Sequence, residues 1–197
     1  MVNTAQLEEY WKAALESHQL GNFAEAEKNY RFILESVPDH ADSLHYLGLL
    51  KRDKGQLDEA LELLERAIKS APNEVELLTN LSTLYLEKKQ FDRAQAAAKK
   101  ALQLGNNSNQ LWVNLVNATI RLKDYDNAQQ QLLQAKAIYA NSPELIFLAG
   151  MIAYEQRQYK KANEQFSQCL AFQEDNVRAR FYYGLSLKYL GRDAEAV

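Results

Sequence analysis

Three histidines and one cysteine are the residues of this sequence best suited to act as a nucleophile, a general base or a metal ligand. His18, His40 and His45 have no Cys, Ser or carboxylate partner at a spacing typical of a catalytic pair or a metal site. Cys169 is the only cysteine, so an intrachain disulfide is impossible. We therefore predict that the chain is not an enzyme and that it holds neither a metal ion nor another cofactor.

The charged residues argue against two classes of partner. The formal net charge is −3, from 23 Lys and Arg residues and 26 Asp and Glu residues. Nucleic acids and anionic membranes both require a concentrated excess of positive charge, and the short basic runs of this sequence are interspersed with acids. We therefore expect no nucleic-acid partner and no membrane partner, and we interpret neighbouring carboxylates such as Glu62 and Glu65 as solvated helix faces.

Neither a secretory signal nor a membrane span is visible in the sequence. The opening residues, MVNTAQLEEYW, lack a basic segment followed by an apolar one, and the longest apolar runs are far shorter than the roughly 20 residues of a membrane helix. A cytoplasmic, reducing setting fits these features and the single cysteine best. A mature chain whose signal had been removed would look the same.

A period of 34 residues runs through the chain. Alanine recurs at this interval without any insertion, at Ala26, Ala60, Ala94, Ala128, Ala162 and Ala196. Glycines follow the same period in two places, one at Gly21, Gly55 and Gly191 and the other at Gly48, Gly150 and Gly184. Because the glycines belong to the repeat, we do not assign them to a phosphate-binding loop.

The residues from Ala41 to Glu74 indicate what one period encodes. Apolar residues three and four apart form two stripes, which are separated by Lys54-Gly55-Gln56 and followed by Ala71-Pro72-Asn73. This spacing matches the 3.6-residue helical period, so each repeat is predicted to be two amphipathic helices joined by a tight turn. A single pair cannot bury both of its apolar faces, so the pairs must stack on one another.

We expect a single array of about eleven helices without strands. Its five complete repeats and one partial repeat are 7–40, 41–74, 75–108, 109–142, 143–176 and 177–197. The next-to-last place of each complete repeat suits a helix N-cap, at Asp39, Asn73, Asn107, Asn141 and Asp175. Ser142 before Pro143 adds a capping serine.

The sequence stops inside the second helix of the partial repeat, without the polar cap that ends most solenoids. We therefore expect that these residues are part of a longer protein. Self-association as a homo-oligomer through the uncapped C-terminal end is a further possibility.

The pattern resembles the tetratricopeptide repeat, whose period and order of residues it matches. In repeat 41–74 the matching residues are Leu44, Leu47-Gly48, Gly55, Ala60, Leu64, Ala67 and Pro72. Trp112 restores the family's tryptophan in the fourth repeat, whereas Lys89, Lys123 and Arg157 replace the turn glycine. The resemblance implies an all-α fold, a right-handed α-solenoid of antiparallel helix pairs, that acts as a non-catalytic protein–protein interaction module.

In proteins of this family the first helix of each pair lines a concave groove that holds a peptide or partner segment. Transferred to this sequence, the resemblance places candidate contacts at His45, Asn80, Asn114, Asn117, Phe147, Met151, Tyr154 and Phe181. Asn80 and Asn114 occupy the same place in successive repeats, and their amides could bind a peptide backbone because they both donate and accept hydrogen bonds. The alternative is that these asparagines satisfy only local groups or water.

The aromatic candidates suggest a second contact region toward the C-terminal end. Phe147, Tyr154 and Phe181, together with Met151, could bury a partner side chain. The same residues could equally pack against downstream repeats or a following domain. The carboxylate clamp by which cochaperone repeats bind acidic tails is not expected, because only Asn117 matches its pattern.

An alternative function remains open at this point. The residues from Leu20 to Asp42 look like the start of bacterial repeat-containing glycosyltransferases. On that interpretation the chain would be the substrate-recruiting or dimerising N-terminal arm of a larger enzyme.

Overall fold

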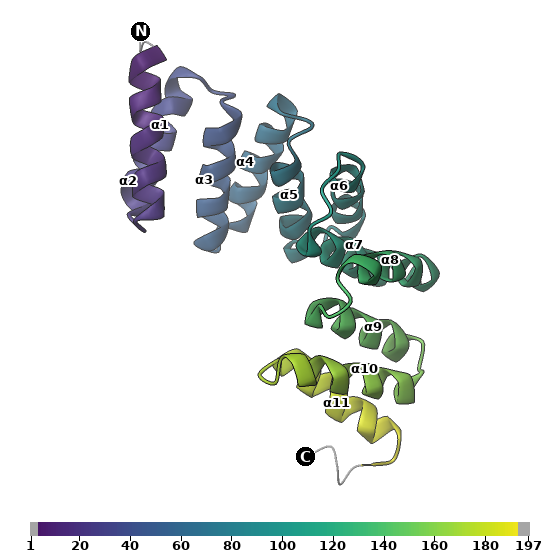
Figure 1. Cartoon of the computed structure of the whole chain (residues 1–197). Coiled ribbons are helices and arrows are strands. Elements are labelled where there is room, and N and C mark those ends of the chain that lie inside the picture. Colours follow the sequence, from purple (N-terminus) through teal and green to yellow (C-terminus); the bar gives the residue numbers. More distant parts are fainter. Residues whose placement is uncertain (1–3, 193–197) are drawn as a thin grey trace. The chain divides into compact units, whose positions relative to one another are not determined.

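The computed structural model describes residues 4–192, and every helix or strand found in that range is an α-helix (Figure 1). These helices are α1 (Thr4–Gln19), α2 (Phe23–Ser36), α3 (Ala41–Asp53), α4 (Leu57–Ser70), α5 (Val75–Glu87), α6 (Phe91–Gln103), α7 (Asn109–Arg121), α8 (Tyr125–Ile138), α9 (Pro143–Glu155), α10 (Tyr159–Phe172) and α11 (Val177–Tyr189). The all-helical prediction is therefore confirmed for the described residues. The second helix expected in the partial repeat, with Ala196, lies outside them.

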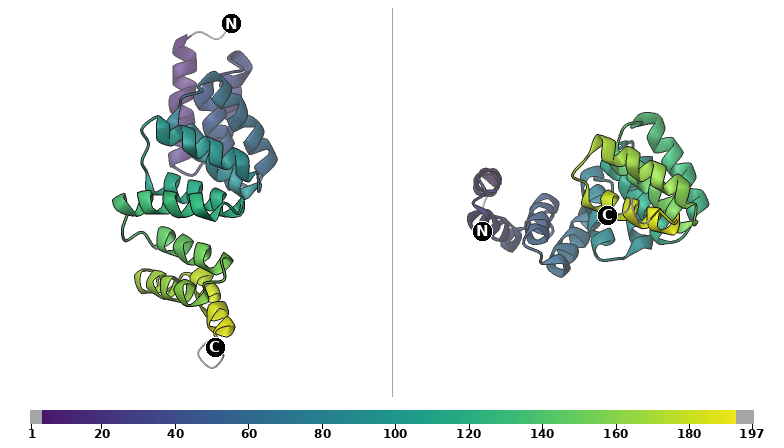
Figure 2. Two further views of the ribbon diagram at one scale, coloured as in Figure 1. Left: turned by 90° about the vertical axis from the view of Figure 1, so that its right-hand side faces the viewer. Right: turned by 90° about the horizontal axis from the view of Figure 1, so that it is seen from below.

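The helices form two compact units, Met1–Gly105 with α1 to α6 and Asn106–Val197 with α7 to α11. Within each unit the two helices of a repeat lie side by side, as the views in Figures 1 and 2 agree. From the second repeat onward, each first helix begins at the first residue of an expected repeat. The boundary between the units falls in the turn between α6 and α7, near the end of the expected repeat 75–108, so it divides no helix pair.

The repeated alanine is completely buried in every described repeat. Its solvent exposure is 0% at Ala26, Ala60, Ala94, Ala128 and Ala162. In the second repeat, a Cβ added to Gly48 on the first helix would lie 3.4 Å from the carbonyl oxygen of Ala60. The alanine place therefore marks a close approach of the two helices, where a larger side chain would force them apart.

Gly48 and Gly150 let a large side chain of the second helix lie directly on the first. A Cβ added to Gly48 would be 2.8 Å from Leu64 Cδ2, and one added to Gly150 would be 2.5 Å from Phe166 Cε1. Leu64 and Phe166 are both fully buried. The glycine in the first helix is therefore a packing requirement of these two helix pairs, whereas Ala14, Ser82 and Val116 occupy the same place in the other complete repeats.

The turn within each repeat needs one residue in the left-handed conformation. Glycine supplies it at Gly21, Gly55 and Gly191, with φ between 71° and 75°. Other residues adopt it at the same place in the remaining repeats, namely Lys89 at 58°, Lys123 at 62° and Arg157 at 60°. A side chain with a Cβ is strained at such φ values, so these three turns are weaker than the glycine turns.

The helix N-caps lie one residue later than the sequence analysis predicted. The caps before the later first helices are His40, Glu74, Ser108, Ser142 and Asn176. All of these side chains except that of Glu74 accept a hydrogen bond from the backbone N–H three residues later. The capping serine at Ser142 is confirmed, whereas the five next-to-last places are not caps, because the first helix starts directly after the last residue of each repeat.

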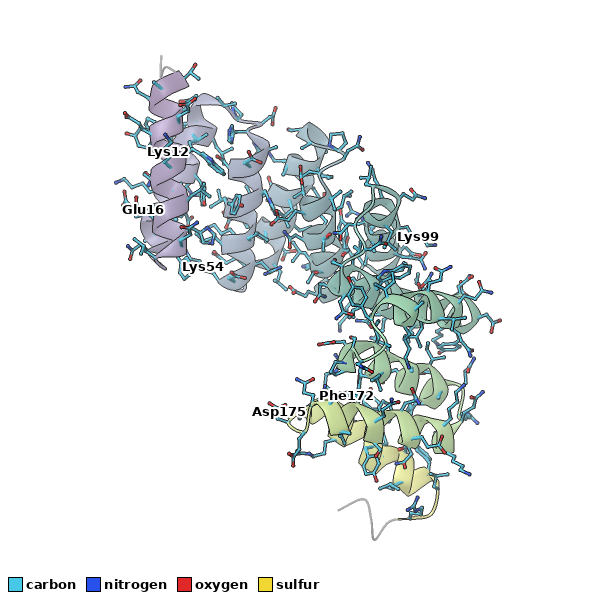
Figure 3. All side chains as sticks on the ribbon, in the orientation of Figure 1. Lys12, Glu16, Lys54, Lys99, Phe172 and Asp175 are labelled. Atoms are coloured by element: carbon cyan, nitrogen blue, oxygen red, sulfur yellow. The ribbon has the colours of Figure 1, made fainter. Side chains whose placement is uncertain are left out.

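A network of charges connects the first two repeats. Lys51 on α3 is 5% exposed, and its Nζ lies 2.6 Å from Glu27 Oε1 on α2. Lys54, labelled in Figure 3, donates 2.8 Å to Glu27 Oε2, and Arg31 joins Glu27 to Glu59 on α4. Burial acts to raise the pKa of Glu27, but hydrogen bonds from the three cations outweigh it and lower the pKa to about 2. The network thus holds the carboxylate ionised beside a buried lysine.

Replacement of the strained turn residues by glycine should stabilise the protein. Arg157→Gly is expected to raise the free energy of unfolding by about 1 kcal/mol, because it removes left-handed strain, and Lys89→Gly and Lys123→Gly should act alike. Gln156→Gly is the matched control, since Gln156 has a φ of −81° and glycine there adds only flexibility. Urea unfolding followed by circular dichroism measures the change. A destabilised Arg157→Gly variant would contradict the strain argument.

Gly150→Ala and Gly48→Ala should lower the free energy of unfolding by different amounts. Both gain helix propensity, but the new methyl group meets the rigid ring of Phe166 in one and the flexible end of Leu64 in the other. We expect Gly150→Ala to lower the free energy of unfolding by about 3 kcal/mol and Gly48→Ala by about 1 kcal/mol. Equal losses in denaturant unfolding would show that the ring does not set the helix spacing.

Candidate binding surfaces

His45 and Asn80 connect two first helices of the N-terminal unit. Asn80 Nδ2 on α5 donates a hydrogen bond of 2.8 Å to His45 Nε2 on α3. Because an amide nitrogen can only donate, Nε2 is the acceptor, and the imidazole is neutral with its proton on Nδ1. Burial lowers the pKa of His45, which is 5% exposed. Three nearby carboxylates, Glu76, Asp42 and Glu74, act to raise this pKa but do not overcome the effect of burial.

The bond to His45 uses only the donor half of the Asn80 amide. Within residues 4–192, Asn80 Oδ1 has no hydrogen-bond donor, and the residue is half-buried rather than enclosed. A carbonyl oxygen in this setting can accept an N–H group of an extended peptide. The side-chain oxygen of Asn80 is thus available for the predicted contact with a peptide backbone. That contact stays a prediction.

Aromatic rings adjoin His45 in the same unit. The ring of Tyr46 has its centroid 5.2 Å from that of His45 and 5.6 Å from that of Trp11 on α1. Trp11 and Tyr46 are half-buried, so part of each side chain is open to solvent. Burial raises the pKa of Tyr46, and the carboxylates of Glu76 and Asp42 raise it further. This region therefore combines aromatic surface with a negative local field.

The two candidate asparagines of the C-terminal unit differ in accessibility. Asn114 on α7 is 2% exposed, and its Oδ1 accepts a hydrogen bond of 2.8 Å from Gln110 Nε2. Asn117, one turn further along α7, is half-buried and has no hydrogen-bond partner for its side chain within residues 4–192. A peptide could contact Asn117 directly, whereas Asn114 is nearly enclosed and already hydrogen-bonded to Gln110.

Phe147 and Met151 on α9 lie largely in the core of the C-terminal unit. They are 5% and 7% exposed, and the Phe147 ring centroid lies 5.6 Å from that of Phe166 and 6.0 Å from that of Tyr182. The guanidinium of Arg178 covers the Phe147 ring at 4.7 Å. These contacts are packing between helices, which the sequence had left open as the alternative.

Tyr154 and Phe181 present more accessible aromatic surface. Phe181 on α11 is 62% exposed. Tyr154 on α9 is half-buried, with ring centroids 5.3 Å from Tyr182 and 6.1 Å from Tyr189. Burial, followed by the interaction with Tyr189, raises the pKa of Tyr154 to about 12, so its hydroxyl stays protonated. Of the four apolar candidates, Phe181 is the one most open to a partner.

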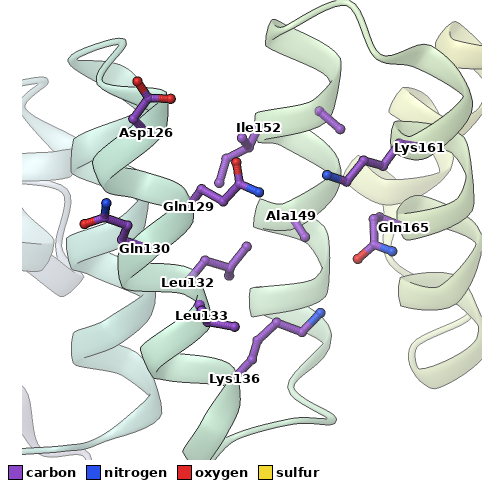
Figure 4. A pocket seen from close by; sticks show the side chains of 11 residues that line it. Asp126, Gln129, Gln130, Leu132, Leu133, Lys136, Ala149, Ile152, Lys161 and Gln165 are labelled. Carbon is purple, nitrogen blue, oxygen red and sulfur yellow. The ribbon is translucent and has the colours of Figure 1, made fainter.

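A groove that the sequence analysis missed lies between α8 and α10, with α9 as its floor (Figure 4). Its volume is about 640 Å³. Both Leu132, which is buried, and Leu133, which is 74% exposed, line this groove. The available sequence signal was this pair of leucines, because two adjacent helical residues cannot both lie at the centre of one apolar face.

The cysteine and two of the histidines, which are the residues best suited to catalysis, lie in packing or helix-capping positions. Cys169 is fully buried, as predicted for its repeat position, and burial raises the pKa of its thiol. His40 caps α3, and His18 Nδ1 lies 3.2 Å from the Tyr30 hydroxyl. In residues 4–192 no three His, Cys, Asp or Glu side chains are grouped so that they could hold a metal ion. Among the helices described, none has both the length and the apolar character needed to cross a membrane.

Comparison with known families accounts for the helical repeats. One model of the tetratricopeptide repeat matches residues 51–100 and 85–146, and a second model of the same repeat matches residues 10–75. The chain belongs to the tetratricopeptide repeat family. Members of this family are generally protein-interaction scaffolds, and this function follows for the chain at that level of detail. No curated protein gives a significant sequence match.

Solved tetratricopeptide structures share the fold. A tetratricopeptide repeat protein from Parabacteroides merdae ATCC 43184 aligns with a TM-score of 0.84 and 18% identity, over 96% of this chain and 75% of that one. PilF of Pseudomonas aeruginosa aligns with a TM-score of 0.74 and 20% identity, over 96% of this chain and 88% of that one. YrrB, a tetratricopeptide protein with an unusual peptide-binding site, aligns with a TM-score of 0.63 and 19% identity, over 85% of this chain and 87% of that one. At these identities the likeness shows the fold alone.

The buried histidine should make stability depend on pH. The folded protein disfavours protonation of His45, whose pKa lies below its ordinary value of 6.5, whereas the unfolded chain takes up the proton freely. The contribution of His45 to the free energy of unfolding is therefore fully present above about pH 6.5, and it is lost as the pH falls below that value. His45→Gln keeps an acceptor for Asn80 but does not titrate.

We expect His45→Gln to lose less unfolding free energy than the native chain between pH 7 and pH 5. Urea unfolding at both pH values measures this difference. His40→Asn, which keeps an N-cap acceptor, controls for the removal of a histidine as such. An unchanged pH dependence in His45→Gln would show that this buried imidazole is not responsible.

Proposed function

We propose that this tetratricopeptide protein is a scaffold that holds an extended, positively charged segment of a partner protein against the first helices of its N-terminal unit. The observation that carries the proposal is the Asn80 amide, whose nitrogen is engaged by buried His45 and whose oxygen has no donor in residues 4–192. A peptide N–H can occupy that oxygen without breaking an existing bond. The peptide-binding site of YrrB, a protein of similar fold, supports a peptide as the class of ligand.

The charge of the segment follows from the surroundings of this amide. Trp11 and Tyr46 offer partly open aromatic surface, and Asp42, Glu74 and Glu76 are exposed. An aromatic face attracts a Lys or Arg side chain through its quadrupole, and nearby carboxylates strengthen that attraction. A basic residue in the segment would therefore lie on the rings while the backbone reaches Asn80.

The C-terminal unit would add contacts of another kind. Asn117 offers a side-chain amide without a hydrogen-bond partner in residues 4–192, and Phe181 offers an exposed ring. We propose that these two residues bind backbone and apolar side chains of a partner and that half-buried Tyr154 adds a further contact. Phe147, Met151 and Asn114 would act by shaping this surface, since each is nearly enclosed.

The test uses the whole chain and two labelled, flexible peptides of equal length, one containing Lys and Arg and the other containing Glu in their place. Fluorescence anisotropy should show tighter binding of the basic peptide. Asn80→Ala should weaken it by up to about tenfold, since one hydrogen bond is lost. The double variant Asp42→Asn/Glu76→Gln should weaken it and reduce its dependence on salt.

The matched control is Glu62→Gln, which removes an exposed carboxylate from the second helix α4. It should bind like the native chain, and thermal unfolding should confirm that all variants are folded. Equal binding of the two peptides, or unchanged binding by both test variants, would refute the proposed surface.

A further inference from the structure

The groove between α8 and α10 is a second candidate for binding, on a different unit from the surface proposed above. Its volume of about 640 Å³ is in the range of sites that bury a ligand. The lining residues come from three consecutive helices, namely Asp126, Gln129, Gln130, Leu132, Leu133, Lys136, Ala149, Ile152, Ala153, Lys161 and Gln165. All of them belong to the C-terminal unit, so the groove is a property of that unit alone.

The floor of the groove is apolar and formed by small residues. Ala149 and Ala153 on α9 lie beneath it together with Ile152, and no long side chain from these two positions fills the space. Leu133 on α8 is 74% exposed at the wall, so most of its side chain is open to a ligand. Apolar side chains of another molecule would be removed from water in this groove, along with Leu133.

The walls carry uncompensated positive charge. Lys136 on α8 and Lys161 on α10 reach toward the groove from opposite sides (Figure 4). Within residues 4–192 neither lysine forms an ion pair, and Asp126 is the only acid among the described lining residues. The adjoining hollow along α10 adds Arg157 and Lys160 against a single acid. Carboxylates of a ligand would therefore find complementary charge on both walls.

The length of the α8 wall favours a helix as the occupant. The lining residues of α8 run from Asp126 to Lys136, which at the rise of an α-helix is roughly 15 Å, or about three turns. A helix of that length presents apolar residues at i, i+3 or i+4 and i+7 to one groove. Acidic residues beside such a stripe would lie near Lys136 and Lys161.

We propose that the groove between α8 and α10 binds an acidic amphipathic helix of a partner protein. Its apolar stripe lies on Leu133 and half-buried Ala149, and its flanking carboxylates pair with Lys136 and Lys161. The occupant differs in charge and in conformation from the basic, extended segment of the N-terminal unit. The two surfaces can therefore be tested independently.

The probe is a synthetic amphipathic helix of about 15 residues with Leu at i, i+3 and i+7 and Glu on both sides of that stripe. A matched peptide carries Lys in place of every Glu. Binding of each peptide to the whole chain is measured by isothermal titration calorimetry. We expect the acidic helix to bind at least about tenfold tighter than the basic one, with an affinity that falls as salt is added.

Two changes to the protein locate the site. Lys136→Glu/Lys161→Glu should weaken binding of the acidic helix by at least about tenfold and strengthen binding of the basic one. Ala149→Met fills the floor without changing charge and should also weaken binding of the acidic helix. Lys69→Glu, the same substitution at one exposed lysine on α4 of the other unit, is the control and should have no effect.

The outcomes separate this proposal from the proposed function. Asp42→Asn/Glu76→Gln should leave binding of the acidic helix unchanged, because those residues belong to the N-terminal unit. Equal binding of the acidic and basic helices would overturn the inference. Unchanged binding of the acidic helix by both the double-lysine variant and Ala149→Met, with circular dichroism showing both folded, would overturn it as well.

Discussion

The close approach of the two helices in each repeat is the constraint on which the rest of this structure depends. A helix pair has two apolar faces and no sheet or further layer to cover them, so its stability comes from contact with its partner helix and the next pair. The buried alanine of the second helix lies at that contact in every complete repeat, and in two of these repeats a glycine of the first helix does so too. At Gly150 the space of a side chain is taken by the ring of Phe166, and at Gly48 by Leu64.

Because packing fixes these places in every repeat, the remaining places of the first helices are free to carry different chemistry. In the N-terminal unit these remaining places are occupied by His45, Tyr46 and Asn80. Their side chains combine aromatic surface with an amide whose nitrogen is hydrogen-bonded and whose oxygen, within residues 4–192, is not. In the C-terminal unit the corresponding places hold Asn114 and Phe147, and both side chains are enclosed. One periodic frame thus places different side chains at equivalent positions, and these side chains range from enclosed Phe147 to exposed Phe181.

The groove between α8 and α10 arises from the same frame. The second and third turns of α9 contribute Ala149 and Ala153, whose small side chains leave space that larger residues would fill. The bordering lysines remain without acidic partners in residues 4–192, whereas the charges of the first two repeats are joined in the network around Glu27. The two proposed surfaces therefore differ in sign, which gives a scaffold a physical means to distinguish two partners.

The sequence by itself determined the period and the helix pairs, because helical spacing and the recurrence of Ala and Gly are local or strictly periodic signals. It also indicated the strained turns at Lys89, Lys123 and Arg157, since a turn glycine was missing there. It placed the N-caps one residue early, because an Asp or Asn two places before a helix resembles a cap in sequence.

Tertiary structure alone decided which candidate residues are accessible. Asn80 and Asn114 share a repeat position, yet one bonds to His45 from a neighbouring repeat and the other is covered beside Gln110. The groove is likewise formed by residues from 126 to 165 on three helices, and no spacing within one helix predicts it. The physical reason is that exposure depends on the size and position of side chains on neighbouring helices, which a periodic pattern does not specify.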